Sequence, residues 1–446
     1  MNEPTQSARP FGLPSATALV VANMVGAGIF TTSGLSLGSL GSRVQVLLAW
    51  LAGGGIALCG AVSYGALARR FAESGGEYLF LSRLTHPLAG FLAGWVSMLA
   101  GFTGAIAFAA AAFESYALPP AFRPAWLPAG AVGVVAIAGF GALHALLLRP
   151  GLLAQNGLVG IKLLLAALFV LYALLVLPRG AWSGLELADA GRPFAVTAFA
   201  STLVWISLSY SGFNAAVYVA GEVTDAQRAV PRALVLGTLG VTALYLALNT
   251  IFLYAPAPGE VAHREDVAAV AAAALGGPWL AWLLRAIICL SLLSSVSAMI
   301  VAGPRVYARM ARDGVLPRVF EAGHAGSTAR SPRAGILFQS VVASVVVLVA
   351  GLRELLGYLG LTLSVSAAAS VSCVFLLGRN GEEHRPSRVA RLCAALFAGA
   401  TCVLALLAVV HEPRQIVAAL ATIISGLFAY RVLDRRSASP RRSTSR

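Results

Sequence analysis

The chain has 446 residues, of which 58% are hydrophobic and only 11% are charged, and its mean hydropathy is +0.82. A soluble domain carries roughly 25% charged residues, so this sequence cannot cover a water-facing globule with polar side chains, and we expect a lipid environment. The formal net charge of +14 does not indicate nucleic acid binding, because the basic residues lie in short segments between apolar runs. Five cysteines lie within apolar runs without metal-binding spacing, so we expect packing roles for them and predict neither a metal site nor a cofactor.

The apolar runs predict the membrane spans directly, because a helix needs about 20 apolar residues to cross the bilayer core. In chain order we expect twelve spans, at residues 14–36, 44–68, 87–118, 126–148, 151–177, 194–219, 232–255, 278–303, 332–350, 353–377, 388–409 and 413–432. Residues 260–277 predict a short amphipathic helix outside the membrane, and residues 433–446 a disordered basic tail.

The distribution of basic residues predicts the orientation of these spans. With a cytoplasmic N-terminus, 23 basic residues fall in inside segments and 8 in outside segments, which favours twelve spans with both termini in the cytoplasm. No small-residue cleavage site follows a short apolar core, so we do not expect a removable signal peptide. An ATP-binding P-loop is excluded because the only lysine of the chain is Lys162, inside a span.

Two spans carry weak points near their centres. Span 1 contains Gly26-Ala27-Gly28, and span 6 contains Ser209-Tyr210-Ser211-Gly212. These residues could be close-packing notches, but their corresponding positions five spans apart favour two broken helices, as in inverted-repeat transporters. A break frees backbone groups at the midplane, which need a partner in lipid. The N–H groups at the break of span 1 suit a carboxylate, and the carbonyls at the break of span 6 suit an ammonium group, so a zwitterion fits both.

Four runs, in order along the chain, resemble the amino acid–polyamine–organocation (APC) permease superfamily. They are VVANMVGAGIF in span 1, ALARRFAESGGEYLFLSRL after span 2, YSGFNAAVYVAGEVTDAQRAVPRAL in and after span 6, and GPRVYARMARDGVLPRVF after span 8. The resemblance implies an all-α integral membrane protein with the leucine-transporter-type 5+5 inverted repeat and two further helices. The chain would then divide into a cytoplasmic N-terminus (1–13), a first repeat (14–177), a second repeat (178–379), spans 11 and 12 (380–432) and the cytoplasmic tail (433–446).

The resemblance also implies a substrate site made mostly of backbone groups. N–H groups would bind the substrate carboxylate at Gly26, Ala27 and Gly28. Carbonyl groups would bind its amino group at Met24, Leu208, Ser209 and Ser211. Phe213 would form a wall or gate. Several members have an aromatic residue where Leu208 stands in this chain. Trp205 could take the place of that residue at the outer gate if it does not simply pack.

Lys162 lies roughly 18 Å deep in span 5. A cation there costs at least ~2.5 kcal/mol, and a position that needed only charge could hold arginine, as elsewhere in this chain. We therefore predict that Lys162 has a role that requires a compact or titratable ammonium group. The resemblance supports a coupling role, with Lys162 filling the space of a sodium site beside Ser294 or Ser295, although a fixed structural hydrogen-bond network is the alternative.

The other polar residues within spans carry weaker predictions. Glu114 is expected at the membrane interface rather than in coupling, and Glu222 in an ion pair or inner latch near Asp225. Asn23 and Asn214 flank the two breaks and could bind substrate or cap freed backbone groups. We expect no carboxylate in the cavity near the breaks, which favours a neutral substrate, and no catalytic constellation appears, so we predict no enzyme.

Together these patterns predict a permease of neutral amino acids in the bacterial inner membrane. It would work by alternating access, without sodium, coupled to protons or to exchange, as a monomer or homodimer. Two alternatives stay open, namely a polyamine or organic amine transporter of the same fold and a membrane sensor that binds amino acids without transport.

Overall fold

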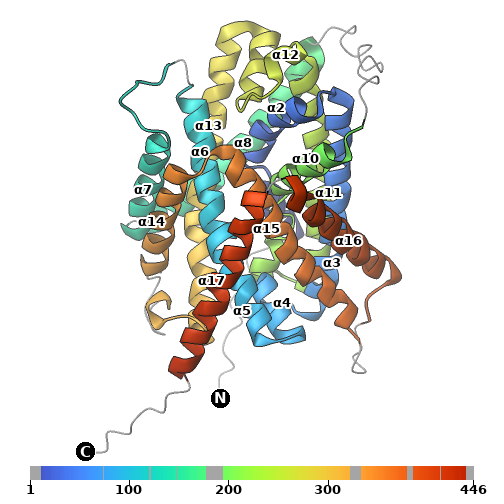
Figure 1. Cartoon of the computed structure of the whole chain (residues 1–446), viewed down its shortest axis with the longest axis vertical. Helices are drawn as coiled ribbons and strands as arrows, with labels where there is room; N and C mark the ends of the chain where they lie inside the picture. The colour runs from blue at the N-terminus through green and yellow to red at the C-terminus, as the bar shows by residue number, and fades with distance from the viewer. Residues whose placement is uncertain are drawn as a thin grey trace, which may run out of the picture.

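The computed structural model describes residues 12–73, 75–119, 122–146, 148–176, 194–321, 333–378, 385–411 and 413–437. For residues 148–159, 162, 163, 408–411 and 434–437 it describes the backbone alone. In these ranges every regular element is a helix. The helices run mainly along the long axis of the molecule, with α4 (Gly76–Leu84) near one end and α12 (Pro258–Val261) at the other (Figure 1). We refer to these as the α4 end and the α12 end.

The remaining helices follow one another along the chain with short connections. They are α1 (Leu13–Met24), α2 (Gly28–Leu40), α3 (Arg43–Arg70), α5 (Pro87–Val96), the π-helix η1 (Ser97–Gly104), α6 (Ala105–Ala117), α7 (Ala131–Leu146), α8 (Leu148–Val176), α10 (Val196–Ser209), the 3₁₀ helix η3 (Ala215–Glu222), α11 (Ala226–Tyr254), α13 (Val267–Arg312), η4 (Arg318–Phe320), α14 (Arg333–Val349), α15 (Leu352–Ser372), η5 (Cys373–Leu376), α16 (Arg388–His411) and α17 (Pro413–Ser437).

The helices match the predicted spans in order. Among the described residues, seven helical segments are long and apolar enough to cross a membrane, and the bent pair α1 and α2 makes an eighth. Four shorter apolar helices occupy the positions of predicted spans 4, 5, 6 and 9. The chain is therefore a multi-pass membrane protein, and the total of twelve spans stays a prediction.

Both predicted interruptions are present. Helix α1 ends at Met24, α2 begins at Gly28, and the two are bent by 42°. Helix α10 ends at Ser209, after which the chain turns and continues as η3. Gly212 in this turn has φ +99°, a conformation that favours glycine.

The connections differ from expectation in three places. The segment after span 2 folds into α4, entered through Gly75 and Gly76 with φ +157° and +55°. The predicted outside helix is the first part of α13, separated from the rest by non-helical backbone at Gly276 and Gly277. One side of this part is buried, through Val267, Ala268, Ala269, Ala271 and Ala272, whereas Ala273 and Ala274 are exposed, which agrees with the predicted amphipathic pattern. Helix α17 extends to Ser437, beyond the predicted start of the tail.

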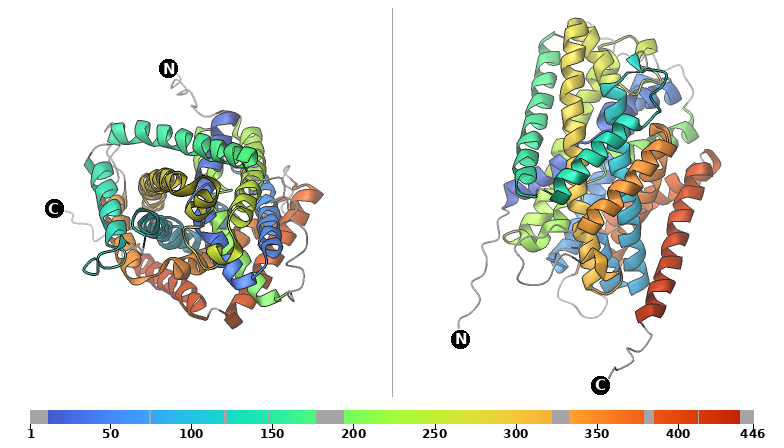
Figure 2. Two further views of the ribbon diagram at one scale, coloured as in Figure 1. Left: turned by 90° about the horizontal axis from the view of Figure 1, so that it is seen from above. Right: turned by 90° about the vertical axis from the view of Figure 1, so that its left-hand side faces the viewer.

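Apolar side chains cover the outside as well as the core. Leu175, Trp279, Leu406 and Phe428 are each more than two thirds exposed, at 77%, 73%, 69% and 71%. Figure 2 shows α17, in red, along the outer edge of the bundle. Because a soluble monomer rarely exposes so much apolar surface, this surface is suited to contact with lipid tails.

Candidate functional site

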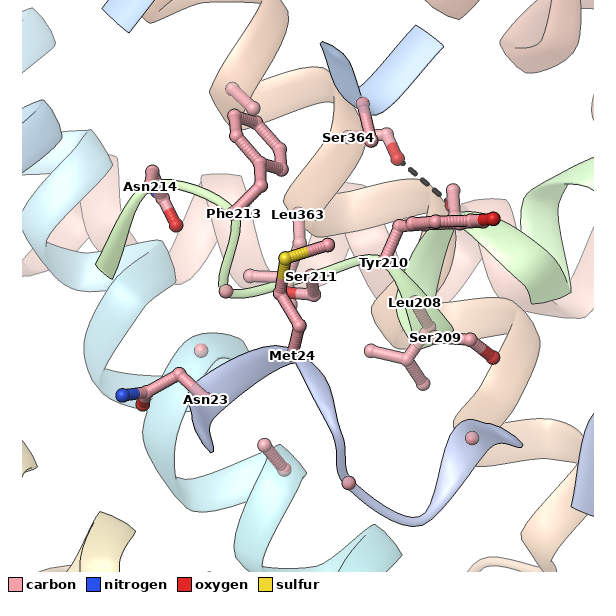
Figure 3. Close-up of a pocket in the computed structure, with 18 of the residues that line it drawn as sticks. Asn23, Met24, Leu208, Ser209, Tyr210, Ser211, Phe213, Asn214, Leu363 and Ser364 are labelled. Atoms are coloured by element: carbon pink, nitrogen blue, oxygen red, sulfur yellow. Dashed lines mark hydrogen bonds between the residues drawn. The ribbon is translucent and has the colours of Figure 1, made fainter. Parts of the chain in front are cut away.

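A cavity of about 180 Å³ lies where the two interrupted spans meet. In Figure 3 the chain at Met24 passes beside the turn from Ser209 to Phe213, and both border the cavity. The other walls come from α3, η1, α6, α13, α15 and α16, so segments far apart in sequence enclose a single space. Every backbone position predicted to bind substrate borders it: Met24, Gly26, Ala27, Gly28, Leu208, Ser209 and Ser211.

Glycines allow the two interruptions to touch. A Cβ added at Gly28 would lie 2.3 Å from Ser209 Oγ and 2.8 Å from Ser209 Cα. A Cβ added at Gly212 would lie 2.9 Å from the backbone carbonyl carbon of Asn23. The hydroxyl groups of Thr32 and Ser209 lie 3.1 Å apart within hydrogen-bond distance. The breaks therefore form one compact unit rather than two independent bends.

The ends of α2 and α10 present opposite backbone groups to the cavity. Among the described residues, no group accepts a hydrogen bond from the N–H of Ala27 or Gly28, at the N-terminal end of α2. The carbonyl of Ser211 likewise accepts none from the described part of the chain. Unpaired N–H groups and a positive helix end suit a carboxylate, whereas a carbonyl after a helix C-terminus suits an ammonium group.

Other backbone groups at the breaks are already engaged. The Gly26 N–H donates to the Met24 carbonyl at 2.8 Å, and Tyr245 Oη donates to the same carbonyl at 2.5 Å. Tyr245 also donates to the Ser209 carbonyl at 2.9 Å. This tyrosine of α11, which does not border the cavity, therefore links the two breaks by hydrogen bonds. Sequence reasoning missed it, because a single tyrosine in an apolar span carries no signal of its partners.

The predicted gate and coupling residues are only partly described. Phe213 borders the cavity and packs edge-on against Tyr64 and Phe397. Ser295 borders the cavity and Ser294 does not, while both hydroxyl groups donate to the Ser291 carbonyl of their own helix. Lys162 lies in α8, but its side chain falls outside the described part of the structure.

The expectation that the cavity holds no carboxylate is wrong. Glu77, in the first turn of α4, borders the cavity and is only 5% exposed. Tyr64 Oη donates to Glu77 Oε1 at 2.9 Å, Asn214 Nδ2 donates to the same oxygen, and Tyr218 Oη donates to Oε2 at 2.7 Å. Sequence reasoning placed Glu77 in a loop, and nothing in the SGGEY run indicated contact with residues some 140 positions away.

The α12 end is closed in this conformation. All of α2 from Gly28 to Leu37 is buried, and the His263 N–H donates to the Gly34 carbonyl at 2.8 Å. Asp266 pairs with Arg264 at 2.8 Å and with Arg285 of α13. Burial alone would raise the pKa of Asp266, but the two guanidinium groups lower it below its usual range. The cavity instead extends toward the α4 end, where Glu77 lines it.

Three further residues singled out in the sequence can be compared with the structure. Glu114, near the end of α6, is 4% exposed and accepts hydrogen bonds from the N–H groups of Gly130 and Gly133 at 2.8 and 3.0 Å beside the start of α7, so it is buried, while its place at the membrane interface stays a prediction. Glu222 is exposed and forms no ion pair within the described residues, so the predicted ion pair is wrong there and the inner latch stays a prediction. Trp205 is buried and does not border the cavity, which agrees with the packing role and not with a gate.

Comparison with known proteins agrees with this architecture. The large neutral amino acids transporter small subunit 2 of Homo sapiens is 27% identical over 79% of this chain and 66% of its own length. The Mus musculus protein of the same name is 26% identical over 95% of this chain and 80% of its own. The Asc-type amino acid transporter 1 of Homo sapiens is 26% identical over 94% and 81%. The sequence model of the family described as "Amino acid permease" matches residues 11–429. The chain belongs to this amino acid permease family.

Proposed function

We propose that this protein carries neutral amino acids across the membrane by alternating access. One observation carries the proposal: in a chain of the amino acid permease family, the free N–H groups of Ala27 and Gly28 and the free carbonyl of Ser211 border one small cavity. The charged ends of a zwitterionic amino acid match these groups in sign, the carboxylate at the N–H groups and the ammonium group at the carbonyl. The related proteins named above are transporters of large neutral and other amino acids.

In the proposed complex the carboxylate lies against the N-terminal end of α2, with the N–H groups of Gly26, Ala27 and Gly28 nearest to it. The amino group lies against the carbonyls at the C-terminal end of α10 and in the turn after it, at Leu208, Ser209 and Ser211. Phe213 then covers the substrate from the α4 end. Side-chain hydroxyl groups of Ser207 and Ser364, which hydrogen-bond each other at 3.0 Å (Figure 3), line the wall beyond the breaks.

Glu77 bears on the choice between neutral and cationic substrates. A free carboxylate in the cavity would favour a polyamine or a basic amino acid. Both oxygens of Glu77, however, already accept hydrogen bonds from Tyr64, Asn214 and Tyr218. The carboxylate is therefore committed to protein donors beside the second break, and a relative named as a transporter of large neutral amino acids supports a neutral substrate.

The remaining parts of the proposal rest on the sequence. The distribution of basic residues supports cytoplasmic termini and a bacterial inner membrane location, in which the α4 end faces the cytoplasm. Coupling would be to protons or to exchange, with Lys162 in place of sodium and Ser294 and Ser295 as its neighbours. The protein would act without enzymatic turnover, as a monomer or homodimer.

Reconstitution into liposomes tests the proposal. Labelled amino acids are offered one at a time to liposomes that are empty or preloaded with unlabelled amino acid, with and without a pH gradient. We expect uptake of neutral amino acids, and competition only by compounds that carry both a carboxylate and an amino group. Competition by amines without a carboxylate would favour the polyamine alternative, and binding without accumulation would favour a sensor.

A further inference from the structure

The short helix α4 contacts α3, the segment after the second break and the end of α13. Glu77 lies on the side of α4 that faces the cavity, and its carboxylate contacts Tyr64 of α3 and both Asn214 and Tyr218 of the segment after the second break. Tyr78, the next residue, donates a hydrogen bond of 2.9 Å to Asp313 Oδ2, immediately after α13. Asp313 in turn pairs with Arg309 of α13 at 3.1 Å. Successive residues of α4 therefore contact the second break and the end of α13.

The Glu77 carboxylate is held by neutral donors alone. Within the described residues, no lysine or arginine forms an ion pair with it, and the three donors use both of its oxygens. Asn214 Nδ2 also lies 3.2 Å from Tyr218 Oη, so the two residues after the break are bonded to each other as well. A buried carboxylate without a cation is stable only where such hydrogen bonds replace its hydration. The carboxylate thus fixes the direction of the chain that leaves the break.

The backbone before Glu77 is shaped for this contact. Gly76 has φ +55°, and a Cβ added there would lie 2.4 Å from Tyr218 Cε1. A side chain at this position would push the Tyr218 ring away from the carboxylate. The glycine at position 76 of the SGGEY run therefore permits the close approach of α4 to η3. The sequence alone does not show that η3 is the element in contact.

We propose that Glu77 is a positioning residue that holds the inner half of span 6 to α3 and, through α4, to the end of α13. The proposal rests on the transport function proposed above. In alternating access the segment after the break must change its contacts at the cavity mouth, and the Asn214 and Tyr218 bonds to Glu77 are the ones that join it to α4. Glu77 acts on the rate of conformational exchange, not on the substrate, since three protein donors already hold its carboxylate in place.

Three variants test this proposal in the full chain. Glu77→Gln keeps the shape but replaces one acceptor by a donor, and Tyr218→Phe removes a single donor with less risk to folding. Tyr358→Phe is the matched control, because Tyr358 Oη also forms a partly buried interhelical hydrogen bond, of 2.7 Å, to Thr422 away from the cavity. Exchange kinetics in liposomes and deuterium uptake of residues 214–222 are measured for each.

We expect Glu77→Gln to lower the maximal exchange rate about tenfold while the half-saturating substrate concentration changes less than about twofold. Deuterium uptake of residues 214–222 rises in Glu77→Gln and Tyr218→Phe, and the rate losses of these two are not additive in the double variant. An unchanged maximal rate with a raised half-saturating concentration would make Glu77 a substrate ligand and overturn the proposal. So would equal effects in Tyr358→Phe. Deuterium uptake needs no substrate, so a wild-type protein that binds no amino acid would refute the transport function and leave this result readable.

Discussion

Replacing Gly28 by alanine tests the contact between the two breaks. The added Cβ would lie 2.3 Å from Ser209 Oγ and 2.8 Å from Ser209 Cα, and because the second atom is backbone, a side-chain rotation alone cannot relieve the overlap. Overpacking of this kind costs about 1–3 kcal/mol. If the cost falls on the arrangement that binds substrate, the dissociation constant rises about 5- to 150-fold. We expect both the thermal stability of the purified protein and its affinity for amino acids to fall.

Gly26 offers an informative comparison. The nearest protein atom to a Cβ added there is the Met24 carbonyl oxygen at 3.9 Å, so Gly26→Ala fits the protein itself. The added methyl group points into space that the proposed substrate occupies. We therefore expect Gly26→Ala to weaken binding about tenfold while the thermal stability stays close to wild type. Gly240→Ala, on α11 with nothing within 4 Å of the added Cβ, is the control for the substitution itself.

The assay is equilibrium binding of a labelled neutral amino acid, with thermal unfolding followed in the same detergent. Wild-type affinity in Gly26→Ala would show that substrate does not lie against the first break. Wild-type stability and affinity in Gly28→Ala would show that the two breaks do not pack as closely as the structure has them. Either result would refute the site assignment, provided that Gly240→Ala behaves like wild type.

Three further predictions concern other parts of the molecule. Tyr245→Phe takes the described donor from the buried Ser209 carbonyl, at about 1–3 kcal/mol, and one of the two donors from the Met24 carbonyl, which keeps the Gly26 N–H, so we expect transport in liposomes to fall at least about tenfold with the protein still folded. Lys162→Ala and Lys162→Arg should both abolish the pH dependence of uptake, and an unchanged pH profile in both would exclude a titratable role. Because the pKa of Asp266 is lowered in the folded protein, its contribution to stability is complete above the usual aspartate value of about 4 and is lost as the pH falls below that value. The melting temperature should therefore drop less between pH 5 and pH 3 in Asp266→Asn than in wild type.

The parts of the fold that follow from local chemistry could be predicted. Glycines within long apolar runs indicated the interruptions after Met24 and Ser209, because a helix in lipid loses its backbone hydrogen bonds only where something replaces them. The same physics brought the predicted backbone positions to one cavity. These features depend on residues close together in the chain.

The contacts that close the site could not be predicted. Glu77 contacts Asn214, which lies about 140 residues further along the chain. Tyr245 contacts Met24, which lies about 220 residues earlier. A polar residue in a connecting segment looks solvated until the neighbouring helices are in place. Helix α4 was missed for the same reason, since its burial comes from α5, α15 and η5 rather than from its own pattern.

The close glycines of the structure serve two different purposes. The Gly28 contact with Ser209 lies within the unit formed by the two breaks, so we expect it to persist when the cavity opens to either side. A Cβ added at Gly34, in contrast, would lie 2.0 Å from the Arg264 carbonyl oxygen, on the segment that covers α2 at the α12 end. That contact must separate whenever substrate enters from the α12 end. A substitution at Gly34 therefore opposes the present conformation alone, whereas one at Gly28 opposes every conformation in which the two breaks bind the same ligand.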